Sequence, residues 1–231
     1  PVLSISVDSL DFFSNETGIY IYGFDTLSEG NYNWDVRRKV HVEFFEKTGA
    51  LAFSQYCDAE IHGNGGRHAP QKSLGLIAQK EYGSGKFHHQ IFPTDSVKKF
   101  DRFLLRNSGH RPDCNPHDDV ADVLLDNMQN EIQHIRPCIV FINGEYWGIQ
   151  TIKDVLNKEY FINKFKWRTN DITILVENGT LADGFVGDEL PWDDLLAYIN
   201  TADMTDSSVY NYVLSKINVS SFTDFQCSEI F

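Results

Sequence analysis

The chain has 231 residues, a formal net charge of −13 at pH 7, 42% hydrophobic residues and 13% aromatic residues. This length and composition predict an ordered globular protein with enough chain to bury a core. The acidic balance argues against nucleic acid or an anionic membrane surface as the main partner. No apolar stretch is long enough for a membrane span, and the first residues lack the basic and apolar segments of a signal peptide.

The first half of the chain is predicted to form short strands. β-Branched and aromatic residues alternate with polar ones in seven segments separated by Gly and Asn residues, which is typical of half-buried strands. The segments cover residues 2–8, 18–23, 39–46, 51–63, 72–79, 86–92 and 101–107.

Two further signals follow a loop rich in Pro, Asp and His. Residues 119–132 place apolar side chains near helical spacing and predict a helix. Asn143 and Gly144 separate two apolar runs, and this pair is typical of the tight turn of a β-hairpin. The hairpin is the clearest local signal in the chain.

The last part of the chain is mainly helical in pattern. Residues 158–165 predict a short helix and residues 171–178 a strand, and helices are predicted after Gly187. These last helices cover residues 191–201, 207–217 and 220–231. Strands first and helices last is an α+β order. We therefore predict a strand-rich nucleotide-binding lobe at residues 1–176 and the start of an incomplete helical C-terminal lobe at residues 177–231.

The first candidate for chemistry is the run Gly63-Asn64-Gly65-Gly66, which is followed by Arg67 and Lys72. Consecutive glycines sacrifice backbone order, but they leave N–H groups able to surround an anion, and the two cations suit a polyphosphate. The run matches neither the P-loop nor the G-x-G-x-x-G pattern. A flexible hairpin with two solvated cations is the alternative that the local residues alone favour.

The second candidate is the segment "HRPDCNPHDD", residues 110–119, which combines His, Cys and Asp side chains. Such residues bind zinc, magnesium or calcium. The spacing fits no standard site, however, and Pro112 and Pro116 are typical of an exposed loop. The cysteines contain no C-x-x-C pair, which disfavours a zinc ribbon or a dithiol redox site. We therefore predict no metal site in this chain.

Taken in chain order, six stretches resemble the CotH family, the spore-coat-H-type atypical protein kinases. They are "PVLSISVD", "TGIYIYG", "NYNWDVRRKVHVEFFE", "AEIHGNGGRHAPQKSLGLIAQKEYG", "FDRFLLRNSG" and "PCIVFINGEYWGIQTIKD". The resemblance implies an atypical protein-kinase-like fold, with a strand-rich antiparallel N-terminal lobe followed by the beginning of a helical lobe. It also implies ATP with Mg or Mn as cofactors, and transfer of the γ-phosphate to serine or threonine of a partner protein.

The resemblance assigns roles to residues of the glycine run. Gly63 and Asn64 would shape the loop around a nucleotide, while Arg67 and Lys72 would hold its phosphates. Arg106 is a weaker nucleotide-binding candidate. Kinase chemistry needs this kind of positioning and charge neutralisation more than covalent help.

Three departures from the family pattern affect the transfer of roles. Gly66 stands where the family has serine or threonine before the arginine, and Asp154 stands where the family tends to show glutamate. Asp154 and Asp119 are expected to support charge pairs, and Asp154 has a shorter reach toward a lysine. The family's metal-binding and catalytic aspartates are expected beyond Phe231, so this chain alone is expected to be inactive.

A second function from another class stays open, because a fold does not fix a function. Relatives in the family also act as adhesins, so the alternative is a non-catalytic cell-surface binding module of the same fold. The expected partners are a nucleotide and a protein substrate, without nucleic acid or a membrane span. The resemblance points to an extracytoplasmic location, at a cell surface or a spore coat.

Overall fold

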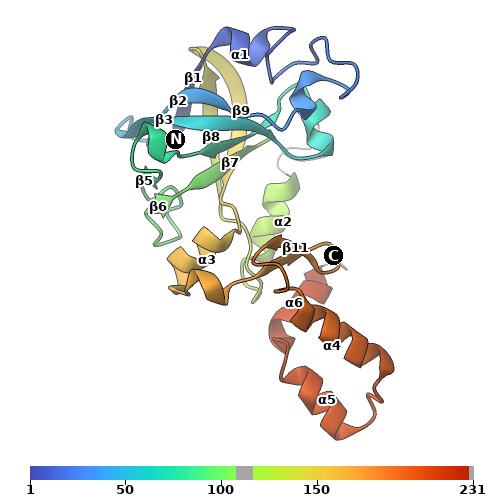
Figure 1. Ribbon diagram of the computed structural model, residues 1–231. Coiled ribbons are helices and arrows are strands. Elements are labelled where there is room, and N and C mark those ends of the chain that lie inside the picture. The colour runs from blue at the N-terminus through green and yellow to red at the C-terminus, as the bar shows by residue number, and fades with distance from the viewer. Residues whose placement is uncertain (108–116, 229–231) are drawn as a thin grey trace. The chain divides into compact units, whose positions relative to one another are not determined.

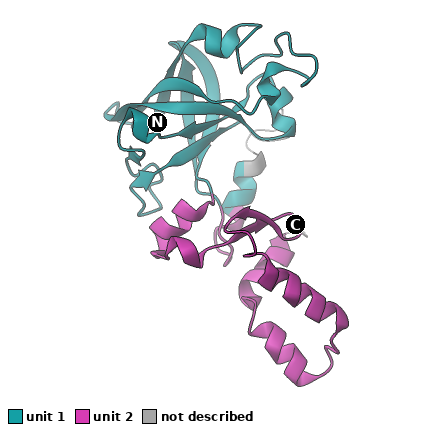
Figure 2. Ribbon diagram, in the orientation of Figure 1, with its two compact units in different colours: residues 1–123, 133–155 teal, residues 124–132, 156–231 magenta. Residues whose placement is uncertain are grey.

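The structure is a computed structural model that describes residues 1–107 and 117–228 (Figure 1). The chain divides into two compact units, which Figure 2 shows in different colours. Residues 1–123 and 133–155 form the first unit, and residues 124–132 and 156–231 form the second. The lobes predicted at residues 1–176 and 177–231 stay a prediction.

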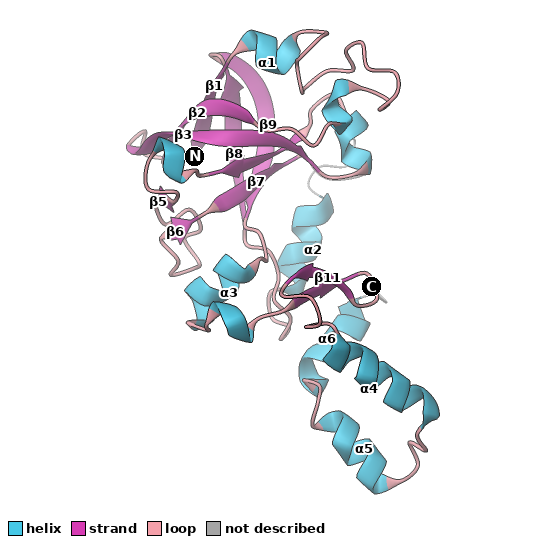
Figure 3. Cartoon of the chain, in the orientation of Figure 1, coloured by secondary structure: helices cyan, strands magenta, loops and turns pink. Residues whose placement is uncertain are grey.

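The first unit is built around a closed barrel of seven strands, in the order β1-β2-β3-β4-β7-β9-β8 (Figure 3). β1 pairs antiparallel with β2 and parallel with β8, and the other neighbouring pairs are antiparallel. The bounds are β1 Val2–Val7, β2 Arg38–Phe45, β3 Leu51–His62, β4 Ser73–Ile77, β7 Arg102–Arg106, β8 Ile135–Ile142 and β9 Glu145–Lys153.

This barrel shows that the predicted fold class is wrong. The structure is not an α+β, kinase-like arrangement of an antiparallel N-terminal lobe followed by a helical lobe, because the sheet closes through the parallel pairing of β1 with β8. In that pairing Val2 lies opposite Ile139 and Ile5 lies opposite Ile142. Alternating hydrophobicity identifies a strand but does not specify its neighbour. The closure therefore left no signal in the local pattern.

The barrel interior is filled by one face of each strand. On β2, for example, Val40, Val42 and Phe44 are buried while the residues between them are partly exposed. Phe87 packs against Phe103 with ring centroids 4.8 Å apart. Burying one such side chain contributes about 1.5–3 kcal/mol. The alternation that predicted these strands therefore also builds the core.

The segment predicted as a strand at residues 18–23 is a loop instead. Ile19 N–H donates to the Asp11 carbonyl and Tyr20 N–H to the Phe12 carbonyl, at 3.0 and 2.9 Å. These bonds dock the segment onto the helix α1 (Ser9–Phe13) and bury two consecutive side chains, Ile19 and Tyr20. A strand that buries only one face cannot bury successive residues.

The remaining elements that precede β8 are short, and the last of them, α2, begins in the first unit and ends in the second. The strand predicted at residues 86–92 contains only the two residues of β5, which pairs with β6. The helix predicted at residues 119–132 begins and ends earlier, as α2. The bounds are η1 Asn31–Asn33, η2 Gly65–His68, η3 Lys80–Tyr82, β5 Phe87–His88, β6 Lys99–Phe100 and α2 His117–Leu125.

The hairpin prediction is confirmed. Asn143 and Gly144 connect β8 and β9 with φ values of 52° and 82°. Two successive positive φ values are the requirement of a type I′ turn. The Asn143 side chain also exchanges two hydrogen bonds with the backbone of Val7, at 2.8 and 3.1 Å. The turn therefore connects to the end of β1.

The second unit contains the predicted helices. The predictions at residues 158–165 and 191–201 are confirmed to within one residue. No helix in the described part of the chain combines the length and the apolar character that crossing a membrane requires. The elements are α3 Lys158–Phe165, η4 Thr169–Asp171, β10 Ile174–Val176, β11 Thr180–Asp183, α4 Leu190–Thr201, α5 Ser207–Leu214 and α6 Val219–Ser228.

Candidate functional site

The glycine run forms the loop between β3 and β4. Gly63 has φ of 97°, in the left-handed region that favours glycine, and the short helix η2 follows. Arg67 Nε donates to the Gly63 carbonyl at 2.5 Å, and Arg67 Nη1 donates to the Tyr32 carbonyl at 3.1 Å. Arg67 therefore closes the loop and connects it to η1. A guanidinium carries five N–H donors, so these bonds leave donors for a further ligand.

Lys72 lies at the end of this loop with only 5% of its surface exposed. Its Nζ donates to the carbonyls of Arg67 and Ala69, at 2.6 and 3.0 Å. Nζ also lies 4.2 Å from the ring centroid of Tyr32. Within residues 1–107 and 117–228, no carboxylate pairs with Lys72. Burial lowers the pKa of Lys72 to about 8, because the charged form is partly removed from water without an anionic partner.

The backbone of Lys72 is held by side chains from distant parts of the barrel. Its N–H donates to Tyr20 Oη at 2.8 Å, and its carbonyl accepts from Gln150 Nε2 at 2.9 Å. Trp147 Nε1 donates to the same Tyr20 Oη at 2.8 Å. Burial raises the pKa of Tyr20, which keeps the phenol neutral. These bonds position the lysine from both sides of the chain.

The neighbours of Lys72 are held in a similar way. Gln71 Nε2 donates to the Trp147 carbonyl at 2.7 Å, and the backbone carbonyl of Gln71 accepts from Asn107 Nδ2 at 2.5 Å. Gly148 permits this approach, since a Cβ there would lie 2.6 Å from Gln71 Nε2. Ser73 Oγ donates to Asn107 Oδ1 at 2.7 Å. Residues 71–73 therefore have a fixed position relative to the hairpin.

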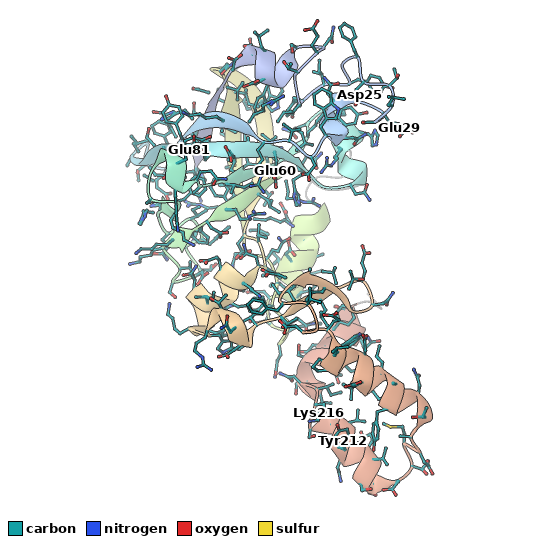
Figure 4. All side chains as sticks on the ribbon, viewed as in Figure 1. Asp25, Glu29, Glu60, Glu81, Tyr212 and Lys216 are labelled. Carbon is teal, nitrogen blue, oxygen red and sulfur yellow. The ribbon has the colours of Figure 1, made fainter. Side chains whose placement is uncertain are left out.

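Arg106 brings a further positive charge beside Gly63. Its Nη1 lies 3.8 Å from the position that a Cβ on residue 63 would take. Burial, followed by the charges of Arg106 and Arg67, lowers the pKa of His62. Glu60, labelled in Figure 4, opposes this effect and pairs with Arg37 at 2.9 Å. The glycine loop is therefore flanked by cations.

Asp119 lies beside a lysine that the sequence analysis did not select. Lys153 Nζ, at the end of β9, donates to Asp122 at 2.5 Å and lies 3.5 Å from Asp119. Thr151 Oγ1 also donates to Asp119. The spacing of Asp119 and Asp122 places both on one face of α2, and this i, i+3 pattern is the signal that could have indicated a buried cation.

Asp154 faces a histidine. His134 Nδ1 lies 2.7 Å from Asp154 Oδ2, and His134 N–H donates to Asp154 Oδ1 at 2.8 Å. Burial raises the pKa of Asp154, and the contacts with His134 oppose that rise. In the described part of the chain, Asp154 pairs with this histidine and with no lysine.

Two further segments need comment: the loop rich in Pro, Asp and His, and the aromatic residues that follow the hairpin turn. Residues 108–116, most of the loop predicted to bind no zinc, lie outside the described residues. Tyr146, the second residue after the hairpin turn, is 63% exposed. Its neighbour Trp147 packs against the core and stacks edge-on against Tyr20, with centroids 5.4 Å apart. Trp147 therefore packs the hairpin against the barrel core.

The family model of CotH kinase proteins matches residues 59–231, the greater part of the chain. The chain belongs to the CotH kinase family. Among curated proteins, a search finds no match to the chain. The CotH match begins at Ala59 on β3, so it includes the loop with Arg67 and Lys72, the β8–β9 hairpin and Lys153. The resemblance drawn from the sequence is therefore confirmed at the level of the family.

Proposed function

We propose that this CotH chain binds the phosphates of ATP at the loop between β3 and β4, in a protein that phosphorylates serine or threonine of a partner protein. One observation carries the proposal: Lys72 is buried and charged, and no carboxylate of the described residues neutralises it. A buried charge without a partner is costly. Phosphate oxygens would supply the missing negative charge.

The donors around the loop suit a polyphosphate. Two of the three Lys72 donors are used by carbonyls, and Arg67 uses its Nε and one Nη1 donor. The remaining N–H groups of the Arg67 guanidinium can donate hydrogen bonds to two phosphate oxygens at once. Phosphoryl transfer depends on such positioning and charge stabilisation. The fit is to the phosphates, and we assign no ligand of the accompanying Mg or Mn ion in this loop.

The two groups of charged residues, around Lys72 and around Lys153, then have different roles. Lys72 and Arg67 bind phosphate, with Arg106 as a neighbouring charge. Lys153 is already neutralised by Asp122 and Asp119. It connects β9 with α2 and acts as a structural ion pair.

Calorimetric titration with ATP and magnesium tests this proposal. Lys72→Ala should weaken binding by about 1–3 kcal/mol, the range of a lost charge-assisted hydrogen bond. Lys98→Ala is the matched control, because it removes one positive charge from an exposed position of the same unit. Equal affinities for the wild type and Lys72→Ala would remove Lys72 from the site. Absence of ATP binding would favour the non-catalytic surface-binding module instead.

A further inference from the structure

Three side chains that can ligate a metal converge at one end of the barrel strands. Asp154 follows β9, His134 precedes β8, and Asp95 comes from the segment between β5 and β6. One ligand atom from each lies within 4.8 Å of the other two. All three residues belong to the first unit. The group lies outside the loop that contains Lys72 and Arg67.

One oxygen of each carboxylate accepts a backbone hydrogen bond, and the other oxygen of each faces His134 Nδ1. Asp154 Oδ1 accepts from His134 N–H at 2.8 Å, and Asp95 Oδ1 accepts from Val97 N–H at 3.2 Å. The other oxygens lie 2.7 Å (Asp154) and 3.9 Å (Asp95) from His134 Nδ1. Asp95 Oδ2 is buried and accepts no hydrogen bond from the described residues, and its side chain is only 7% exposed. A buried oxygen of this kind requires an explanation.

The group also keeps a net negative charge even when His134 is protonated, because one histidine faces two carboxylates. In residues 1–107 and 117–228, no Lys or Arg pairs with Asp95 or Asp154. A second carboxylate–histidine pair in the first unit also has an arginine partner. Glu46 contacts His89 at 2.6 Å, but Arg136 Nη1 also donates to Glu46 at 3.0 Å and neutralises it. Two carboxylates buried together beside a single histidine still repel each other.

We propose that Asp95, His134 and Asp154 bind a divalent transition-metal ion of the zinc class, through one oxygen of each carboxylate and His134 Nδ1. An ion held about 2 Å from each atom separates its ligands by roughly 3.3 Å. The observed separations of 2.7 and 3.9 Å from Nδ1 lie on either side of that value. Mixed nitrogen and oxygen ligands suit zinc better than magnesium or calcium. The proposal differs from the prediction from the sequence that this chain has no metal site, and that prediction stays untested.

The backbone bonds to Asp95 and Asp154 serve the site as outer contacts. Such contacts fix the direction of a ligating carboxylate. Gln133 Nε2 also donates to the Asp154 carbonyl at 2.5 Å. Phe92 covers the histidine ring, with centroids 5.7 Å apart. Three protein ligands leave a fourth position for water or another ligand.

Calorimetric titration of the chelator-treated full chain with ZnCl₂ tests the site. The wild type should bind one equivalent saturably, and Asp95→Asn should weaken that binding at least tenfold. His89→Gln is the matched control, since it alters the neutralised pair and should leave zinc affinity unchanged. Without metal, Asp95→Asn should unfold at the same or a higher temperature than the wild type, because it removes a buried repulsion. With zinc, the order should reverse.

A cobalt spectrum keeps the test decisive even where a variant fails to fold. Co²⁺ bound to the wild type should show ligand-field bands without thiolate charge-transfer bands, because the three ligands contain no sulfur. Thiolate bands would show that cysteines bind the ion and would overturn the proposal. Absence of saturable binding, or equal zinc affinity for wild type and Asp95→Asn, would overturn it as well.

Discussion

Two lysines of the first unit, Lys72 and Lys153, have similar burial but different surroundings. Their exposed fractions are 5% and 3%. Lys153 contacts two carboxylates of α2, Asp122 and Asp119. The Lys72 ammonium is surrounded by the carbonyls of its own loop and an aromatic ring. Lys153 therefore completes an ion pair inside the protein, whereas the positive charge of Lys72 has no carboxylate partner among the described residues.

This difference separates a structural cation from a binding cation. A buried ion pair with good geometry requires no further ligand, and breaking it is costly. Carbonyl dipoles orient an ammonium but carry no net negative charge. Burial therefore lowers the pKa of Lys72 to about 8. The same contrast applies to carboxylates, where Glu46 is neutralised by Arg136 while Asp95 and Asp154 share one histidine and pair with no Lys or Arg of the described residues.

The largest expected effect is the loss of stability when Lys153 is replaced. Lys153→Met should lower the free energy of unfolding by about 3–5 kcal/mol, because it removes the buried cation that contacts both Asp122 and Asp119. Urea denaturation followed by circular dichroism measures the change. The double variant Lys153→Met with Asp122→Asn should be less destabilised than the single one. A loss below about 1 kcal/mol for Lys153→Met would show that this pair is not structural.

The effect of pH on the affinity for ATP is expected to be intermediate in size. Only the charged form of Lys72 attracts phosphate, and its pKa is about 8. The affinity for ATP should therefore fall as the pH rises from about 7 to about 9. Lys72→Arg keeps its charge in this range, so its affinity should change little. A wild-type affinity that is independent of pH across this range would contradict the role of Lys72.

The smallest effect is expected for the stability of Lys72→Met. The variant removes a buried charge that has no acidic partner, so the free energy of unfolding should change by less than about 1 kcal/mol. In the wild type the unfolded chain binds more protons than the folded chain between pH 8 and pH 10.5, so stability should rise with pH there. This rise should be absent in Lys72→Met, and urea denaturation at several pH values measures it. A rise of equal size in both proteins would assign it to other groups.

The sequence predicted local structure more fully than pairing. Most barrel strands were predictable because a strand with one buried face alternates, and Asn143-Gly144 specified the hairpin. The parallel pairing of β1 with β8 joins segments far apart in sequence, so no local pattern revealed it. The docked loop at Ile19 and Tyr20 depends on carbonyls of α1 in the same way.

The candidate site was also predictable only in part. The glycine run located Lys72 and Arg67, but not the carbonyls that surround them. Lys153 was missed because its acidic partners lie on another element, and burial of both faces of β9 from Gln150 onward hides the usual alternation. The Asp95–His134–Asp154 group joins three segments without any sequence motif. Long-range packing, rather than residue spacing, brings these groups together.

The most direct test of the central claim is the pKa of Lys72 measured with and without ATP and magnesium. Nuclear magnetic resonance of isotope-labelled lysine side chains can follow this titration, with Lys72→Arg used to assign the signal. The account predicts a pKa near 8 in the free protein, and a clear rise when ATP binds because phosphate favours the charged amine. A Lys72 pKa that ATP leaves unchanged at saturation would contradict the account.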